Sequence, residues 1–352
     1  MASLMGTIRV IQPGLLTTIQ DLGRWGFGKI GMPVAGVMDD YAARVGNILL
    51  GNDENTPVLE VTLLGPVLFF HSETYLVLTG GDLQPCINNR RIPMWTVYRV
   101  KQGGILSFAG SVQGCWAYIA VAGGFEVKTV MGSASTYLRG NLGGYDGRSL
   151  KAGDVLTSGE TLRRPIAPGF TLPSAYYPDY RDTIRVILGP QDDAFTEKGI
   201  ETFLSAEYTV TNEADRMGYR LDGPAIAHKN GADIISDGIA LGAIQVPAHG
   251  KPIIMLADRQ TTGGYAKIAN VISVDIPLVA QKKPGDHLRF EKISIEEAQT
   301  LSRERKQRLE SLKQLIQTKV IEPSGQIASY TLIVNGQKYE VSVERVSSGV
   351  IM

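Results

Sequence analysis

Glycine and proline interrupt this chain so often that they limit the length of any regular element. The 352 residues include 40 glycines and 17 prolines, and both residue types weaken or end helices. The segments between them are short and rich in Val, Ile, Tyr and Thr, which favour strands. The sequence therefore predicts a mainly β fold with few helices. The clearest expected strands are residues 76–79, 117–121, 184–188 and 252–256.

Two helices are expected within this β-rich pattern. The first spans residues 39–50, where Asp39 can cap the first amide groups and Gly51 can end the helix. The second spans residues 294–318, which are highly charged and carry only a narrow apolar stripe. We expect the second helix to lie on the surface.

Short motifs recur in the two halves of the chain and indicate a duplicated plan. Residues 78–82 resemble residues 188–192, and each motif follows an apolar strand. A polar, proline-broken segment near residues 161–182 separates the halves. We predict three parts: an N-terminal β domain over residues 1–165, a second β domain over residues 182–292, and a C-terminal helix and hairpin over residues 293–352.

The predicted hairpin rests on the pair Asn335-Gly336, which lies between strand-like residues 330–334 and 337–343. Both positions of such a turn need positive φ, which Asn and Gly tolerate. An isolated hairpin is marginally stable and needs a partner. We expect it to dock on this chain or on another protein chain, or else to stay mobile.

Charge and cysteine content argue against several classes of protein. Lys and Arg together number 35, as do Asp and Glu, so the chain has no net positive charge to attract nucleic acid or an acidic membrane. Cys86 and Cys115 lack C-x-x-C spacing and stand among apolar or small residues, as reduced thiols do. The start of the chain has no secretory signal pattern, and no apolar run could span a bilayer. We expect a cytoplasmic protein.

The usual signatures of metal, nucleotide and acyl-enzyme sites are missing from the sequence. The four histidines are scattered, so we expect no metal site. Residues 26–31 match G-x-G-x-x-G, but Pro33 and Gly36 disfavour the helix that a dinucleotide site needs, which favours a surface loop. No phosphate-binding G-x-x-x-x-G-K-[ST] motif and no G-x-S-x-G elbow occur. ATP use by this chain alone has no motif to support it.

Two polar segments are candidates for a binding site. Gln20, Asp21 and Arg24 fall within five residues of a turn and could bind a planar amide or urea, or Asp21 and Arg24 could clamp the turn internally. Residues 258–264 follow an apolar strand, and we expect a loop whose backbone amides face an anion or a carbonyl. Both interpretations of the first segment stay open, whereas a functional role is favoured for the second.

The sequence resembles the biotin-dependent carboxyltransferase family, whose members are called allophanate hydrolase subunit 2, KipA or the C component of 5-oxoprolinase. The resemblance covers about residues 8–290 in order. The motifs that carry it are residues 13–24, Gly36-Val37-Met38-Asp39, Gly46-Asn47 with Gly51-Asn52, Leu59-Glu60-Val61-Thr62, residues 189–195, residues 215–221, Ile235-Ser236-Asp237-Gly238, residues 242–247 and residues 258–265.

This resemblance implies two cyclophilin-like β-barrel-type domains and an enzyme of several protein chains. It implies a KipI-like protein, the B component, and the A component of 5-oxoprolinase as partners. The implied reaction is the ATP-dependent opening of 5-oxoproline, a lactam, to glutamate. No covalently bound cofactor is expected, and ATP is used by the assembled complex.

Two alternatives to lactam hydrolysis remain open. One is the transfer of a carboxyl group from carboxybiotin to urea or a similar amide, with biotin supplied from elsewhere because no Met-Lys-Met sequence is present. The other is a non-enzymatic, KipA-like role in which the chain binds a KipI-like inhibitor of a kinase.

Residue roles follow from the resemblance together with the chemistry of a lactam or urea. Arg24 and Arg259 are expected to polarise a carbonyl or hold an oxyanion, with Asp21 and Asp258 to orient them or accept a proton. These four are the predicted catalytic residues. The predicted substrate-binding residues are Gln20, Arg216, Arg220, Gln245, Gln260, Thr261, Thr262, Gly263, Gly264 and Tyr265.

Overall fold

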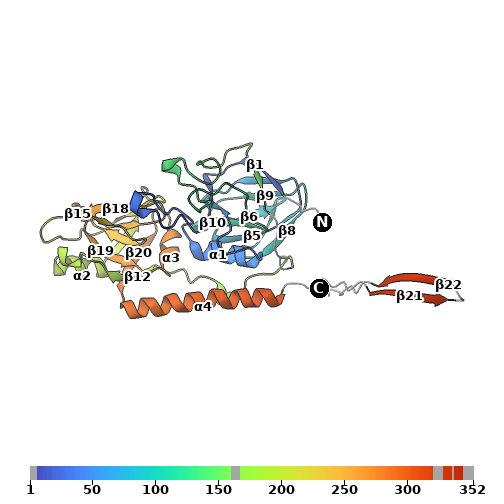
Figure 1. Ribbon diagram of the computed structural model, residues 1–352. Helices are drawn as coiled ribbons and strands as arrows, with labels where there is room; N and C mark the ends of the chain where they lie inside the picture. The colour runs from blue at the N-terminus through green and yellow to red at the C-terminus, as the bar shows by residue number, and fades with distance from the viewer. Residues whose placement is uncertain (1–5, 160–166, 320–327, 335–336, 344–352) are drawn as a thin grey trace.

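The computed structural model describes residues 6–159, 167–319, 328–334 and 337–343. Figure 1 shows two β-rich halves side by side, with a long helix along one side of both. The prediction of a mainly β fold with few helices is confirmed. Within the described residues, no helix combines the length and apolar character that crossing a bilayer requires.

The N-terminal half consists of two antiparallel sheets. One has the strand order β11-β1-β4-β9-β6-β7 and the other has the order β2-β3-β10-β5-β8. The strands are β1 (Thr7–Gln12), β2 (Leu16–Gln20), β3 (Val58–Thr62), β4 (Val67–Phe70), β5 (Thr74–Asp82), β6 (Pro85–Ile87), β7 (Arg90–Arg91), β8 (Val97–Val100), β9 (Ile105–Phe108), β10 (Gln113–Val121) and β11 (Val155–Thr157). Strands β3, β5 and β10 are almost wholly buried because apolar residues cover both faces.

Helix α1 (Asp40–Leu49) packs against β5 and β10 and confirms the first predicted helix. The Asp39 side chain accepts a hydrogen bond from Ala42 N, as an N-cap should, and Gly51 follows the helix with a φ of +72°. Thr79 of β5 donates to Ala42 O at 2.8 Å, which fixes the helix to the sheet.

The C-terminal half contains a closed barrel with the order β12-β19-β16-β17-β14-β13-β20, in which β12 and β20 pair in parallel. The barrel strands are β12 (Thr183–Leu188), β13 (Glu207–Val210), β14 (Gly218–Asp222), β16 (Ala243–Gln245), β17 (Ile253–Met255), β19 (Lys267–Val271) and β20 (His287–Lys292). A separate two-stranded ribbon joins β15 (Asp233–Gly238) to β18 (Thr262–Tyr265). Three of the predicted strands lie within β5, β10 and β12, and the fourth, residues 252–256, contains β17. The predicted domain limits stay a prediction.

Two helices of the C-terminal half were not predicted. Helix α2 (Glu197–Ser205) contains Gly199, which weakens a helical pattern, although Thr196 caps its first turn. Helix α3 (Ile276–Ala280) is only five residues long and fully buried, so it shows no amphipathic period.

Helix α4 (Ile295–Lys319) lies against both halves and confirms the second predicted helix (Figure 1). Its Leu309, Leu312 and Ile316 are buried. Arg305 pairs with Asp40 of α1 and donates to Ser273 O beside α3, so one side chain touches both halves. The hairpin strands β21 (Ala328–Val334) and β22 (Gln337–Val343) pair as expected, and the predicted turn residues lie outside the described residues.

The two halves are joined by the side chain of Gln281, which follows α3. Its Oε1 accepts from Cys115 N and Trp116 N at 3.0 and 3.1 Å, where the β10–β5 register is irregular. Its Nε2 donates to Trp116 O and to Asp39 Oδ2, each at 2.9 Å. Gly114, with a φ of +75°, leaves the space for this amide, because a Cβ there would lie 2.5 Å from Gln281 Oε1.

We expect Gln281→Ala to lower the free energy of unfolding by about 3 kcal/mol or more, because it leaves several buried polar groups without partners. Gln307→Ala, at an exposed position of α4, should change it by no more than about 0.5 kcal/mol. Urea denaturation of both variants measures the difference, and equal effects would contradict this role of Gln281.

Candidate functional site

A cleft of about 560 Å³ lies between the two halves and α4. Most of its walls are apolar, and each part of the fold contributes to them. The apolar lining residues are Leu22, Trp25, Val34, Ala35, Val37 and Met38 from the first half, Leu241, Leu256, Ala257 and Ile276 from the second, and Leu309 from α4. A largely apolar cleft with a few polar groups is the usual form of a small-molecule site.

Arg259 is the predicted catalytic residue that lines this cleft. Its side chain is buried, with a residue exposure of 9%. Nε donates to Ile239 O at 3.1 Å and Nη1 donates to Leu256 O at 3.2 Å. Arg259 forms no ion pair with a carboxylate of the described residues, and burial lowers its pKa to about 10. The guanidinium therefore stays protonated at neutral pH while its charge is poorly solvated.

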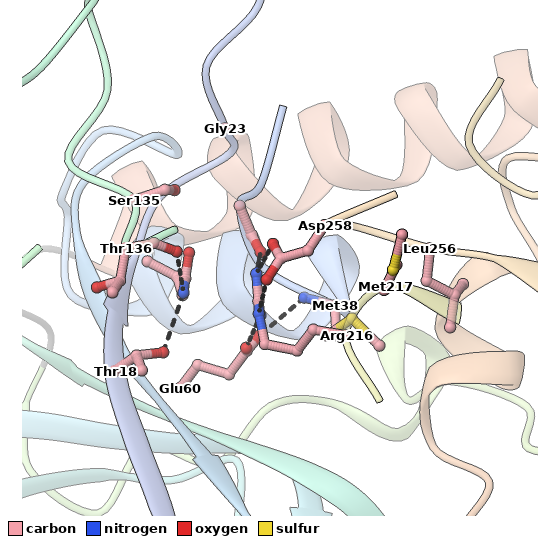
Figure 2. Close-up of polar contacts among 12 residues, drawn as sticks. Thr18, Gly23, Met38, Glu60, Ser135, Thr136, Arg216, Met217, Leu256 and Asp258 are labelled. Atoms are coloured by element: carbon pink, nitrogen blue, oxygen red, sulfur yellow. Dashed lines mark hydrogen bonds and ion pairs between the residues drawn. The ribbon is translucent and has the colours of Figure 1, made fainter. Parts of the chain in front are cut away.

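Asp258 and Arg216 are brought together, but as an ion pair rather than as free site groups (Figure 2). Arg216 donates from Nε and Nη2 to the two oxygens of Asp258 at 3.0 and 2.9 Å. Nη1 pairs with Glu60 of β3, and Nη2 also donates to Gly36 O at 2.6 Å. Burial alone would lower the pKa of Arg216, but Asp258 and Glu60 outweigh it and raise this pKa.

Glu60 was missed as a functional candidate by the sequence reasoning. It is fully buried, and Oε2 accepts from Met38 N at 2.7 Å and from Tyr118 OH at 2.9 Å. Burial raises its pKa, although Arg216 opposes the shift. The available signal was a carboxylate in the middle of the apolar run Val58–Thr62, since such a group needs a buried partner.

Asp21 and Arg24 lie away from the cleft lining and are each buried in the first half. Asp21 accepts hydrogen bonds from Gly23 N and from the Ser133, Ala134 and Ser135 segment. Arg24 donates to Val130 O at 3.0 Å and to Ser135 O at 2.9 Å. These two side chains form no ion pair with each other in the described part of the chain, so each clamps the turn onto residues 130–135 separately.

The turn held in this way carries two residues of the cleft wall, Leu22 and Trp25. Arg24 N donates to Val34 O at 2.7 Å, and Trp25 Nε1 donates to Leu22 O at 2.9 Å. Trp25 is 62% exposed. Its exposure at the edge of the cleft was a second feature that the sequence reasoning missed.

Gln20 and Gln245 are buried and Gln260 is partly buried, and the three glutamines do not form one group. Gln20 donates to Thr18 Oγ1 at 2.9 Å and to Thr136 O at 3.1 Å, and Figure 2 labels the two acceptor residues. Gln245 donates to Tyr265 O at 3.4 Å. Within the described residues, Gln20 Oε1 and Gln260 Oε1 are buried without a hydrogen-bond partner.

The expectation of a free loop over residues 258–264 is wrong for its second half. Thr262, Gly263, Gly264 and Tyr265 form strand β18 and pair with β15, which takes up part of their backbone hydrogen bonding. Thr261 precedes this strand and its carbonyl accepts from Ile239 N at 3.0 Å. The ribbon is not part of the cleft lining.

Arg220 is separated from the other candidates. It lies on the barrel strand β14, where Nη1 donates to Glu213 O at 2.8 Å and Nε pairs with the Glu213 carboxylate at 3.3 Å. Arg216, four residues before it, pairs instead with Asp258 and, across the two halves, with Glu60. Within the described residues, no group of three His, Cys, Asp or Glu side chains could hold a metal ion.

We expect Arg216→Met to lower the free energy of unfolding by about 3–5 kcal/mol, because it leaves two buried carboxylates without their counter-charge. Arg220→Met is the matched control on the same segment, and its exposed ion pair should contribute no more than about 1 kcal/mol. Similar losses in urea denaturation would contradict the proposed importance of the buried pair.

The stability of the protein should depend on pH through Asp39. This residue accepts a hydrogen bond from Gln281, and its backbone N donates to Tyr118 OH. The Tyr118 hydroxyl in turn donates to Glu60, the partner of Arg216. Burial raises the pKa of Asp39 to about 6, although the Ala42 and Gln281 hydrogen bonds oppose the shift. Between about pH 4 and 6 the folded protein therefore binds more protons than the unfolded chain, and stability falls as pH rises.

Asp39→Asn removes this titration. The unfolding free energy of the natural protein, minus that of the variant, should decrease by about 2 kcal/mol between pH 4 and pH 7. Denaturation curves across this range measure the change. A difference that stays constant with pH would show that Asp39 has an ordinary pKa.

Comparisons with known proteins place the fold in a family. The model of the carboxyltransferase domain, subdomain A and B, matches residues 30–292. The C component of 5-oxoprolinase from Haemophilus influenzae is 39% identical over 306 residues, which are 86% of this chain and 96% of that protein. The protein of the same name from Escherichia coli K12 is 35% identical over 293 residues, 83% of this chain and 93% of that protein.

A solved structure agrees with these relatives. The K. lactis urea amidolyase has a TM-score of 0.82 and 30% identity over 96% of this chain, which spans only 22% of that structure. The family model covers most of the chain, and the two bacterial relatives match it over nearly their whole length. The chain therefore belongs to the family of carboxyltransferase domains, subdomain A and B.

Proposed function

We propose that this chain is the C component of an ATP-dependent 5-oxoprolinase, which opens 5-oxoproline to glutamate together with a KipI-like B component and an A component. The supporting observation is the extent of the match. This chain covers 96% and 93% of two bacterial proteins named as the C component of 5-oxoprolinase, but only 22% of the urea amidolyase structure. A name that designates one component of an enzyme also supports membership in an assembly of several chains.

Opening a lactam requires that its amide resonance be overcome. In the proposed reaction, the lactam carbonyl oxygen takes the terminal phosphoryl group of ATP and ADP leaves. Water then adds to the activated carbon, and the protonated ring nitrogen leaves to give an acyl phosphate. A second water molecule hydrolyses this acyl phosphate to glutamate and phosphate. The apolar cleft would hold the ring and keep bulk water from the phosphorylated intermediate. The assembled complex uses the ATP in this proposal, and the chain needs no covalently bound cofactor.

The candidate residues have two kinds of role in this proposal. Arg259 touches the substrate in the cleft. Asp258 is a positioning residue, because its pairing with Arg216 fixes the turn that leads into Arg259. Asp21 and Arg24 are positioning residues for the turn that carries Leu22 and Trp25. Gln260 and the β18 ribbon are proposed to make contacts only in the assembled complex. Gln245 is buried and donates to Tyr265 O, so it is a positioning residue for the end of β18.

Carboxyl transfer from carboxybiotin to urea is the second candidate function, and the match to K. lactis urea amidolyase favours it. Urea is also a planar amide whose carbonyl must be polarised, so the same cleft could hold it. The carboxybiotin would come from another domain or chain.

Co-expression of this chain with the KipI-like protein and the A component tests the proposal. Purified complex should release glutamate from 5-oxoproline with ATP, and omission of any one chain should abolish the release. Urea with carboxybiotin, and binding of the KipI-like protein alone, are assayed in parallel. An intact complex that leaves 5-oxoproline unchanged would refute the proposal, and carboxylated urea or binding without turnover would then identify the alternative.

A further inference from the structure

The charged groups that line the cleft leave one buried cation without a counter-charge. Asp40 pairs with Arg44 at 3.3 Å and with Arg305 at 2.5 Å. Glu54 pairs with Arg44 at 2.7 Å, and Glu310 pairs with Lys313 at 2.7 Å. Each carboxylate among the lining residues of the described chain is therefore already matched by a cation. Arg259 has only carbonyl partners, so the buried part of the cleft carries one unmatched positive charge.

The hydrogen bonds of Arg259 leave one side of its guanidinium available. Nε and Nη1 are held by Ile239 O and Leu256 O, which fixes the plane of the group. No hydrogen bond from Nη2 to a described residue is present. A guanidinium fixed in this way can donate to a carboxylate without first losing side-chain freedom, and it binds planar carboxylates well.

We propose that Arg259 binds the carboxylate of the substrate, and that the cleft selects small cyclic amides with one negative charge over neutral amides. The inference rests on the proposed function, which it deepens. It gives Arg259 a different task from polarising the reacting carbonyl: the residue holds the far end of the molecule, and the apolar walls hold the ring methylenes. Leu256 contributes both an apolar wall and the carbonyl that orients Arg259.

This charge arrangement bears differently on the two candidate functions. In lactam opening the anion is 5-oxoproline itself, which is a monoanion at neutral pH. In carboxyl transfer urea is neutral, and the anion would be the carboxylate of carboxybiotin. Desolvation lowers the pKa of Arg259 to about 10, which agrees with a charge that lacks a nearby anion. A bound carboxylate would supply that anion.

Two pairs of ligands that differ only in this charge test the inference. The first pair is L-5-oxoproline and its primary carboxamide, and the second is cyclopentanecarboxylate and cyclopentanecarboxamide, which have no lactam. Binding to the full chain is measured by calorimetry, and KM and inhibition are measured in the assembled complex. Arg259→Gln should weaken binding of each carboxylate at least 10-fold and change binding of each carboxamide less than 3-fold. Arg259→Lys should keep part of the preference.

Arg289→Gln is the matched control, because Arg289 is an exposed arginine of the barrel that pairs with Glu207. It should leave all four ligands unaffected. Equal losses for carboxylates and carboxamides in Arg259→Gln, or no loss for either, would overturn the inference. Charge-dependent binding of cyclopentanecarboxylate without glutamate release would keep the inference and refute the 5-oxoprolinase assignment. Glutamate release by the Arg259→Gln complex with an unchanged KM for 5-oxoproline would keep the 5-oxoprolinase assignment and refute the inference.

Discussion

The buried guanidinium of Arg216 determines how the two halves of this protein meet. It lies just before a barrel strand, yet it pairs with Glu60 of the N-terminal half as well as with Asp258 of its own half. Two carboxylates and one guanidinium in an apolar interior are unfavourable unless their hydrogen bonds are complete. Gly36 O, Met38 N and Tyr118 OH complete them, and all three belong to the N-terminal half. Any shift between the halves would break this set.

The same junction explains why the cleft has a defined shape. One wall follows a turn that Asp21 and Arg24 hold against residues 130–135, and the opposite wall follows the turn at Asp258 and Arg259. Neither Asp21 nor Arg24 reaches the cleft itself. Polar residues that look functional in the sequence, such as Asp21 and Arg24, therefore fix the position of apolar neighbours, and few of the predicted site residues line the cleft.

Local sequence patterns predicted most helices and strands, but they could not predict contacts between residues that are far apart in the sequence. Helix α1 is visible in the sequence because Asp39 and Gly51 mark its ends, and β5 and β10 are visible as apolar runs. The pairing of Arg216 with Glu60 joins residues 156 positions apart, so no spacing rule could indicate it. Helix α2 contains a glycine, and the ribbon of β15 and β18 is short and exposed, which hides both from pattern analysis. Arg259 does line the cleft, and its role remains a proposal.

Helix α4 closes one side of the cleft from beyond residues 30–292, the part that the family model matches. Two ion pairs of partly exposed groups hold it to the N-terminal half. Arg305 pairs with Asp40 of α1, and Lys313 pairs with Glu54, which follows α1. Salt screens such pairs far more than the buried pair of Arg216. Ionic strength therefore weakens the ion pairs of α4 more than the junction between the two halves, and at high salt the buried Leu309, Leu312 and Ile316 carry most of the attachment of this wall of the cleft.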